Sequence, residues 1–407
     1  MKILHTADWH LGKMLDNFSR LDEQRDVLNE ICEIADQQAV DVVIVAGDLF
    51  DGFAPSSAAT ELLYSTLHRL SANGTRAVVA IAGNHDSPER IEVPDALARA
   101  CGIVFVGFPN VEIAPFKTQG GISVLKTDKG FLELQLPNCD TPLRLLLTPY
   151  ANEVRLKTFL GMEQSERSLR EYLQEHWENL ANKYCDNEGV NILVTHLFLM
   201  KRGGEKSEEP DDEKPILYVG GASEVYSENI PAQIQYVALG HLHRYQVIDK
   251  IPCPMVYSSS PLAYSFAEAN QSKFVVLLDC QANKPIDYQA IELKKGKKLL
   301  RAKFEKIDDA LLWLAQNQDA LVQITIVTDT YLEAADKRRL LEAHPMMMPI
   351  IPELRKKQSN ENLKTKALAS LGDQGMEEVF RAYFEYKKGQ SPNEEIMSVF
   401  KELLAGE

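Results

Sequence analysis

The feature that most constrains the fold of this chain is the alternation of apolar runs with helix-like segments over its first hundred residues. Short apolar runs occur in "KILHTADWH", "DVVIVAGDLFD" and "AVVAIAGNHD". Amphipathic segments, "LDEQRDVLNEICEIADQ" and "SSAATELLYSTLHRL", lie between them. Strands that alternate with helices indicate βαβ units, so this part of the chain predicts an α/β fold with a parallel sheet.

The next part of the chain predicts a second sheet. Residues 103–150 contain the short alternating runs "ISVLKT", "FLELQL" and "RLLLTPY", which indicate an antiparallel extension. A long amphipathic helix is predicted over 163–184. The apolar runs in "NILVTH" and "YVALGHLH" then return to buried strands, and "MVYSSS" and "KFVVLLDC" continue this sheet.

Five polar stretches each follow one of the apolar runs: "DWH", "GDLFD", "GNHD", "TH" and "GHLH". Each alone has a bland interpretation, because a histidine at a strand end is usually structural. In open α/β sheets, however, loops at the carboxyl ends of strands converge on one crevice. Carboxylates, one amide and neutral imidazoles suit divalent cations bound by oxygen and nitrogen. The series therefore predicts a site for two metal ions, with a degenerate site kept for packing or binding as the alternative.

The predicted ligands form two sets around Asp48, which we expect to bridge the ions. The first ion is assigned to Asp8, His10 and His243, and the second to Asn84, His196 and His241. Two adjacent ions would acidify a shared water and clamp the attacking and leaving oxygens of a displacement at phosphorus. Glycines at 47, 83 and 240 would let the backbone approach the ions closely.

His85 follows Asn84 directly but should point differently, which suits a general acid for the leaving group. A carboxylate from Asp51 or Asp86 could support its charge. Asp86 has an equally plausible role as the cap of a helix beginning in "SPER". The other four histidines are interpreted as core or surface residues: His5, His68, His176 and His344.

Composition limits the remaining alternatives. A chain of 407 residues suggests two or three domains. No apolar run approaches the roughly 20 residues that span a bilayer, and no leader is apparent, so we expect a cytoplasmic protein without a membrane segment. Six scattered cysteines indicate reduced thiols. The net charge of −15 argues against a protein that binds nucleic acid over most of its surface. Residues 294–306, however, carry a net charge of +6. This segment could contact a polyanion or be a solvated linker.

The sequence predicts four segments. Residues 1–290 form the core, 291–354 a strand–helix–strand–helix module, 355–375 a linker, and 376–407 two amphipathic helices. Each of these helices carries five large apolar residues on one face. We expect them to dock on a partner, with packing on the chain's own body as the alternative. The acidic stretch 201–215 indicates a loop that gates a site or has no role.

In order and type, the five polar stretches resemble the pattern of the calcineurin-like metallophosphoesterases: DxH, GDxxD, GNH(D/E), a lone His and GHxH. "ILHTADWHLGK", "AGNHDSPER" and "ALGHLHRYQ" are similar, more closely, to the SbcD-like nuclease subunits. This resemblance implies a core of two packed mixed sheets flanked by helices. It also implies a small α/β capping domain that contacts DNA, a C-terminal helical segment, and manganese in the site.

The resemblance further implies a DNA nuclease that acts in repair and recombination. Its expected activities are 3′ to 5′ exonuclease action on duplex ends and endonuclease action on single strands or hairpins. Its expected state is a homodimer bound to two copies of SbcC, an ATPase with long coiled coils, through the C-terminal helices. Two positions depart from the family pattern: Ser259 stands where relatives often have glycine, and Asp51 stands where archaeal relatives carry histidine.

Two other functions fit the same residues. The same two-metal chemistry serves phosphodiesterases or phosphatases of small molecules or phosphoproteins, which would not need residues 294–407. A non-catalytic tether of DNA ends would keep the metals and the tail but not require His85.

Overall fold

The computed structural model describes residues 1–151, 169–204, 225–328 and 332–354, and six positions beyond them: Phe380, Arg381, Phe384, Pro392, Met397 and Phe400. By their internal contacts the residues form two compact units. One comprises Met1–Ile326 with Ala334–Ile351, and the other Val327–Glu333 with Pro352–Glu407. Within the described residues, no helix combines the length and the apolar character needed to cross a bilayer.

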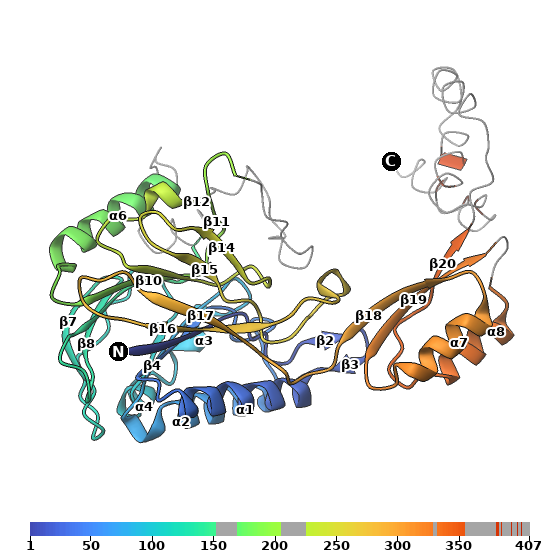
Figure 1. Ribbon diagram of the computed structural model, residues 1–407, viewed down its shortest axis with the longest axis horizontal. Helices are drawn as coiled ribbons and strands as arrows, with labels where there is room; N and C mark the ends of the chain where they lie inside the picture. Colours follow the sequence, from blue (N-terminus) through green and yellow to red (C-terminus); the bar gives the residue numbers. More distant parts are fainter. Residues whose placement is uncertain are drawn as a thin grey trace, which may run out of the picture. The chain divides into compact units, whose positions relative to one another are not determined.

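The first sheet has six strands (Figure 1). Their spatial order is β17 (Asp287–Glu292), β16 (Phe274–Asp279), β1 (Lys2–Thr6), β4 (Val42–Ala46), β5 (Ala77–Ile81) and β6 (Ile103–Val106). Strands β1, β4, β5 and β6 run parallel, which confirms the prediction from the strand–helix alternation. Every residue of β4 and β5 is buried, which explains why these strands read as continuous apolar runs.

Helices cover the outer face of the first sheet. They are α1 (Leu21–Gln37), α2 (Ser57–Leu70), α3 (Pro88–Glu92) and α4 (Asp95–Ala100). The apolar faces of α1 and α2 pack in one cluster with Val43 and Val45 of β4. Helix α2 begins at Ser56, whose side chain accepts a hydrogen bond from the Ala59 N–H.

The second sheet has seven strands. Their order is β14 (Gln246–Asp249), β15 (Met255–Tyr257), β13 (Tyr236–Leu239), β10 (Val190–Thr195), β9 (Leu143–Thr148), β8 (Phe131–Gln135) and β7 (Ser123–Asp128). Strands β7, β8 and β9 pair antiparallel, as predicted for residues 103–150. Helix α6 (Leu169–Tyr184) packs on this sheet through Leu173 and Trp177. The residues predicted to extend it toward 163 lie outside the described part.

The two sheets pack face to face around a shared apolar core. Ile44 and Val79 of the first sheet lie in one cluster with Leu145 and Ile192 of the second. Each sheet contains both parallel and antiparallel pairs. The predicted fold class, two packed mixed sheets flanked by helices, is therefore confirmed.

The core also contains several two-residue strands and 3-10 turns. These are β2 (Met14–Leu15), β3 (Phe18–Ser19), β11 (Leu199–Met200), β12 (Val225–Tyr226), and the 3-10 turns η1 (Ala72–Gly74), η2 (Ser227–Asn229) and η3 (Phe266–Glu268). All six cysteines are free, in agreement with the prediction of reduced thiols.

The predicted module after residue 290 contains the expected elements. They are β18 (Leu299–Phe304), α7 (Ile307–Gln316), β19 (Leu321–Thr328) and α8 (Ala334–Glu342). A further strand, β20 (Ile351–Leu354), was not predicted. The strands form a three-stranded sheet in the order β18-β19-β20. We call residues 291–354 the capping module; its boundary with the core stays a prediction.

The C-terminal predictions fall largely outside the described residues. The linker at 355–375 lies there entirely, as do residues 205–215 of the acidic stretch. Of the two predicted helices, Phe380, Phe384, Met397 and Phe400 are helical. The Phe380 and Phe400 rings stack with centroids 3.8 Å apart, so these two apolar side chains contact each other.

One buried ion pair yields a stability prediction. Arg144 on β9 donates through Nε to Glu133 on β8 at 2.6 Å, and both side chains are buried. The substitution Arg144→Met leaves a buried carboxylate without its main partner, so we expect it to lower the free energy of unfolding by about 3 kcal/mol. Urea unfolding followed by circular dichroism measures this loss.

The double variant Glu133→Gln/Arg144→Met is the matched control. It leaves no charge buried and should recover most of the lost stability. Equal stability of Arg144→Met and the unsubstituted protein would contradict this account of the pair.

Candidate metal centre

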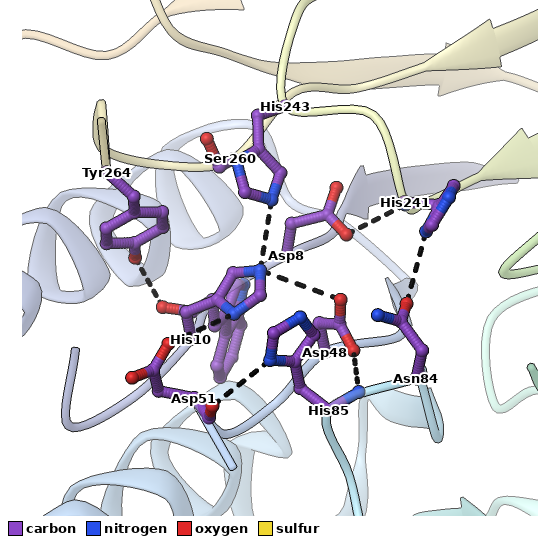
Figure 2. Close-up of polar contacts among 12 residues, drawn as sticks. Asp8, His10, Asp48, Asp51, Asn84, His85, His241, His243, Ser260 and Tyr264 are labelled. Carbon is purple, nitrogen blue, oxygen red and sulfur yellow. Dashed lines mark hydrogen bonds and ion pairs between the residues drawn. The ribbon is translucent and has the colours of Figure 1, made fainter. Parts of the chain in front are cut away.

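The candidate metal centre lies where the carboxyl ends of strands from both sheets meet. Asp8 and His10 follow β1, Asp48 follows β4, and Asn84 follows β5 of the first sheet. From the second sheet, His196 follows β10, and His241 and His243 follow β13. Figure 2 shows side chains from these loops gathered in one place. The structure thus brings together all seven residues that the sequence predicted as ligands.

The first predicted set surrounds a point between His10 and His243. Their Nε2 atoms lie 3.0 Å apart, and His10 Nε2 lies 3.6 Å from Asp48 Oδ2 (Figure 2). Possible ligand atoms of Asp8, His10 and His243 all lie within 4.8 Å of one another. Two imidazole nitrogens and a carboxylate that face one point form a set suited to a cation.

The second predicted set lies on the other side of Asp48. His196 Nε2 is 3.1 Å from Asp48 Oδ2 and 3.0 Å from Asn84 Oδ1. His241 Nδ1 is 3.1 Å from the same Asn84 oxygen. Possible ligand atoms of Asp8, Asp48 and His196 also lie within 4.8 Å of one another. Asp8 therefore borders both sets, whereas the sequence assigned it to the first alone.

Three of the four histidines have contacts behind their rings that orient them toward the centre. His196 Nδ1 lies 2.8 Å from the Ala46 carbonyl and donates to it, which leaves Nε2 directed at Asp48 and Asn84. His243 Nδ1 lies 3.4 Å from Glu268 Oε1, and His10 Nδ1 lies 3.7 Å from Asp51 Oδ1. Such outer contacts set the tautomer and orientation of metal-binding histidines.

The electrostatics of the site fit bound cations. Burial raises the pKa of Asp8 to about 6, although His196 and His243 lower it. Burial alone would lower the pKa of His196, but Asp48 and Asp8 raise it to about 9. Asp8 Oδ2 is buried without a hydrogen-bond partner among the described residues. Buried carboxylates at this density need positive charge nearby, and divalent cations would supply it.

The predicted close approach of glycines is visible at three positions. A Cβ added to Gly83 would lie 2.0 Å from Asp48 Oδ1, and one added to Gly47 would lie 2.0 Å from His196 Nδ1. A Cβ on Gly240 would lie 1.7 Å from the Ala46 carbonyl oxygen. Asp8 and Asp48 adopt positive φ angles of 56° and 49°. Strained backbone of this kind is maintained where the surroundings hold it, often at functional sites.

Two contacts hold His85, one through its backbone and one through its ring. Its N–H donates to Asp48 Oδ1 at 2.9 Å, and its Nδ1 lies 3.1 Å from the Asp51 carbonyl (Figure 2). The Asp51 carboxylate forms an ion pair with Lys13 at 3.0 Å. His10, Asp51 and His85 form a third group whose possible ligand atoms lie within 4.8 Å of one another.

Asp86 is not the helix cap that the sequence suggested. Its carboxylate accepts hydrogen bonds from the N–H groups of Leu49, Phe50 and Gly83, at 2.8 to 3.0 Å. The cap of α3 is Ser87 instead. Asp86 therefore ties the loop after β5 to the loop after β4, which holds Asp48 and Asn84 in register.

Sequence reasoning missed several residues that support the centre. Glu268 and Lys273 lie behind His243, and Tyr264 donates from its hydroxyl to the Trp9 carbonyl. Gln24 donates from Nε2 to the His10 carbonyl at 2.7 Å. Of these residues, only Gln24 could have been noticed in the sequence, because it is a polar residue on an otherwise apolar helix face.

Ser259 occupies a position where the resemblance implied glycine, and its surroundings show how serine fits. Its φ is 80°, in the left-handed region that favours glycine. The Ser259 hydroxyl accepts a hydrogen bond from the Phe274 N–H at 2.9 Å, which compensates part of the strain. Of the four histidines predicted to lie outside the site, His5 is a core residue. Its ring lies against Tyr236, and burial lowers its pKa to about 3.

Comparison with known proteins agrees with this geometry. Residues 1–245 match the family model described as calcineurin-like phosphoesterase, which places the chain in that class of metal-dependent hydrolases. The SbcD subunit of the SbcCD nuclease of Bacillus subtilis (strain 168) is 33% identical over 415 aligned residues, 100% of this chain and 98% of the relative. The chain therefore belongs to the SbcD family.

Two further relatives are SbcD subunits of SbcCD nucleases as well. That of Staphylococcus epidermidis is 31% identical over 74% of this chain and 71% of its own length. That of Rhodobacter capsulatus is 33% identical over 69% of this chain and 66% of its own length.

The crowding at Gly240 leads to a prediction. In Gly240→Ala the added Cβ collides with the Ala46 carbonyl that orients His196. We expect weaker binding of divalent cations and a loss of about 1–3 kcal/mol in stability. Manganese titration by calorimetry and thermal unfolding measure the two effects.

The matched control is Gly52→Ala, next to Asp51, where an added Cβ meets nothing within 4 Å. It should bind cations as the unsubstituted protein does. Unchanged cation binding by Gly240→Ala would show that the Ala46–His196 contact does not govern the centre.

Proposed function

We propose that this chain is the nuclease subunit of an SbcCD-type complex and hydrolyses phosphodiester bonds of DNA with two divalent cations. The observation that supports this most strongly is the convergence of seven buried or half-buried ligand-type side chains, Asp48 among them, in a chain of this family. Asp8, His10 and His243 would hold one ion, and Asn84, His196 and His241 the other. Manganese suits this set of carboxylate, amide and imidazole donors.

Cations bound there would supply an acidified water as nucleophile and neutralise charge at phosphorus. Within the protein, Asp48 is positioned to bridge, because Oδ2 lies 3.6 Å from His10 Nε2 and 3.1 Å from His196 Nε2. Its Oδ1 is held by the His85 N–H, so the carboxylate cannot rotate away from either set without breaking that bond.

His85 is the proposed general acid. Its Nδ1 faces the Asp51 carbonyl, a hydrogen-bond acceptor, so Nδ1 carries a proton and Nε2 is the atom that exchanges one with the leaving group. The ring is half-buried, so substrate can reach it. His85 also lies near enough to His10 and Asp51 to act as a ligand, but the Nδ1 contact with backbone favours the acid role.

The basic run at 294–306 is the proposed contact for the DNA backbone. The N–H groups of Lys294 and Lys295 donate to Glu30 on α1, and that of Lys297 donates to Glu23. The backbone of this loop is thereby fixed, while the side chains of Lys294, Lys295, Lys297 and Lys298 are exposed. A fixed loop with exposed ammonium groups supports phosphate binding over a solvated linker.

The finer functional assignments follow from the family. We propose 3′ to 5′ exonuclease action on duplex ends and endonuclease action on single strands or hairpins, in DNA repair and recombination in the cytoplasm. The partner is an SbcC-type ATPase, docked through residues 376–407, in a heterotetramer with a homodimer of this chain. The names of the relatives, which describe one subunit of an SbcCD nuclease, support the partner.

Substitution of His85 distinguishes a catalytic nuclease from a non-catalytic tether of DNA ends. His85→Gln keeps the seven proposed ligands but removes the acid, so cleavage of duplex DNA should fall by about 10²–10⁴-fold. Cleavage is measured with manganese, ATP and the ATPase partner. Two manganese ions should still bind in calorimetry.

The outcome that would sink the proposal is an unsubstituted complex that binds manganese but cleaves no DNA under these conditions. If the chain instead hydrolysed a small phosphodiester, and still did so after removal of residues 294–407, the small-molecule alternative would be preferred.

Chelation gives a second test. Treatment with EDTA should abolish cleavage and lower the thermal unfolding midpoint, because cations that bind only the folded state stabilise it. Both properties should return on addition of manganese. A midpoint that EDTA and manganese leave unchanged would contradict the proposed centre.

A further inference from the structure

A buried ion pair lies directly behind His243. Glu268 and Lys273 are 3% and 7% exposed, and the Lys273 ammonium contacts Glu268 Oε2. The contact between the ammonium and the carboxylate makes the two residues an ion pair. Neither residue belongs to the predicted ligand pattern.

The pair holds His243 at two points. Glu268 Oε1 lies 3.4 Å from the ring Nδ1, and the Lys273 ammonium donates to the His243 carbonyl at 2.8 Å. Lys273 also donates to the Ser260 hydroxyl at 3.0 Å. Both the ring and the backbone of His243 are thus fixed, while Nε2 points to His10 (Figure 2).

The turn that carries Glu268 is itself anchored. Glu268 Oε1 accepts the N–H groups of Tyr264 and Ser265, at 3.0 and 3.1 Å, and so closes η3. At the other end of the turn, Phe266 packs in an apolar cluster with Leu299, Leu321 and Met348 of the capping module. The carboxylate is therefore anchored independently of His243, by these backbone hydrogen bonds and by the packing of Phe266.

A contribution to folding stability does not by itself explain why Glu268 and Lys273 are buried as a pair. Replacing a buried ion pair with apolar residues of similar volume is often neutral or stabilising, because the charges lose their hydration. A carboxylate behind a metal-binding imidazole has a different use: it fixes the Nδ1–H tautomer, orients the ring and raises its basicity.

We propose that Glu268 and Lys273 are positioning residues that hold His243 in the orientation and tautomer required for one of the two cations. The inference rests on the proposed function for the role of His243 as a ligand. The experiment that tests this inference measures manganese binding and the tautomer of the His243 ring, and does not depend on DNA cleavage.

The double variant Glu268→Gln/Lys273→Met removes both charges and so avoids an unpaired buried ion. We expect manganese to bind about 10–100-fold more weakly at one of two sites in calorimetry, with the other site unchanged. In the protein without metal, nitrogen NMR of labelled histidine should show His243 changing from one tautomer to a mixture.

The control is the equivalent double variant of the other buried pair, Glu133→Gln/Arg144→Met, which should leave both readouts unchanged. Two manganese sites of unaltered affinity in Glu268→Gln/Lys273→Met, or an unaltered His243 tautomer, would overturn the proposal. Failure of the unsubstituted complex to cleave DNA would instead count against the nuclease function, and would not alter either readout.

Discussion

The centre depends on one contact between the two sheets. The carbonyl of Ala46, at the end of β4 in the first sheet, accepts a hydrogen bond from His196, which follows β10 in the second. The loop after β13 passes so close to the same carbonyl that a Cβ at Gly240 would lie 1.7 Å from its oxygen. This close approach brings the candidate ligands of the second sheet, such as His196, within reach of Asp48.

The sequence was sufficient to predict much of this arrangement. Strands β4 and β5 are buried on both faces, so their apolar runs are continuous and easily recognised. The polar residues come directly after those runs, and parallel strands end at a common edge. The type and position of each candidate ligand could therefore be proposed before the path of the chain between them was known.

The supporting residues could not be predicted in the same way. Asp86 holds two loops through backbone N–H groups, and such contacts leave no pattern in side-chain identity. Glu268 and Lys273 lie in a polar stretch around a short turn, where one acid and one base are ordinary until folding buries them against His243. Asp8 borders both ligand sets because its strand lies centrally in the first sheet, a matter of strand order that composition does not encode.

The division of the ligands between the two sheets has a consequence for the newly synthesised chain. Asp8, His10, Asp48 and Asn84 are made early, and His196, His241 and His243 are supplied by a separate layer more than a hundred residues later. A chain in which only one layer has formed carries half a centre and cannot assemble the full set. With the proposed ligands, hydrolysis would require both layers to be folded, and fragments or immature copies of the chain would not cleave DNA.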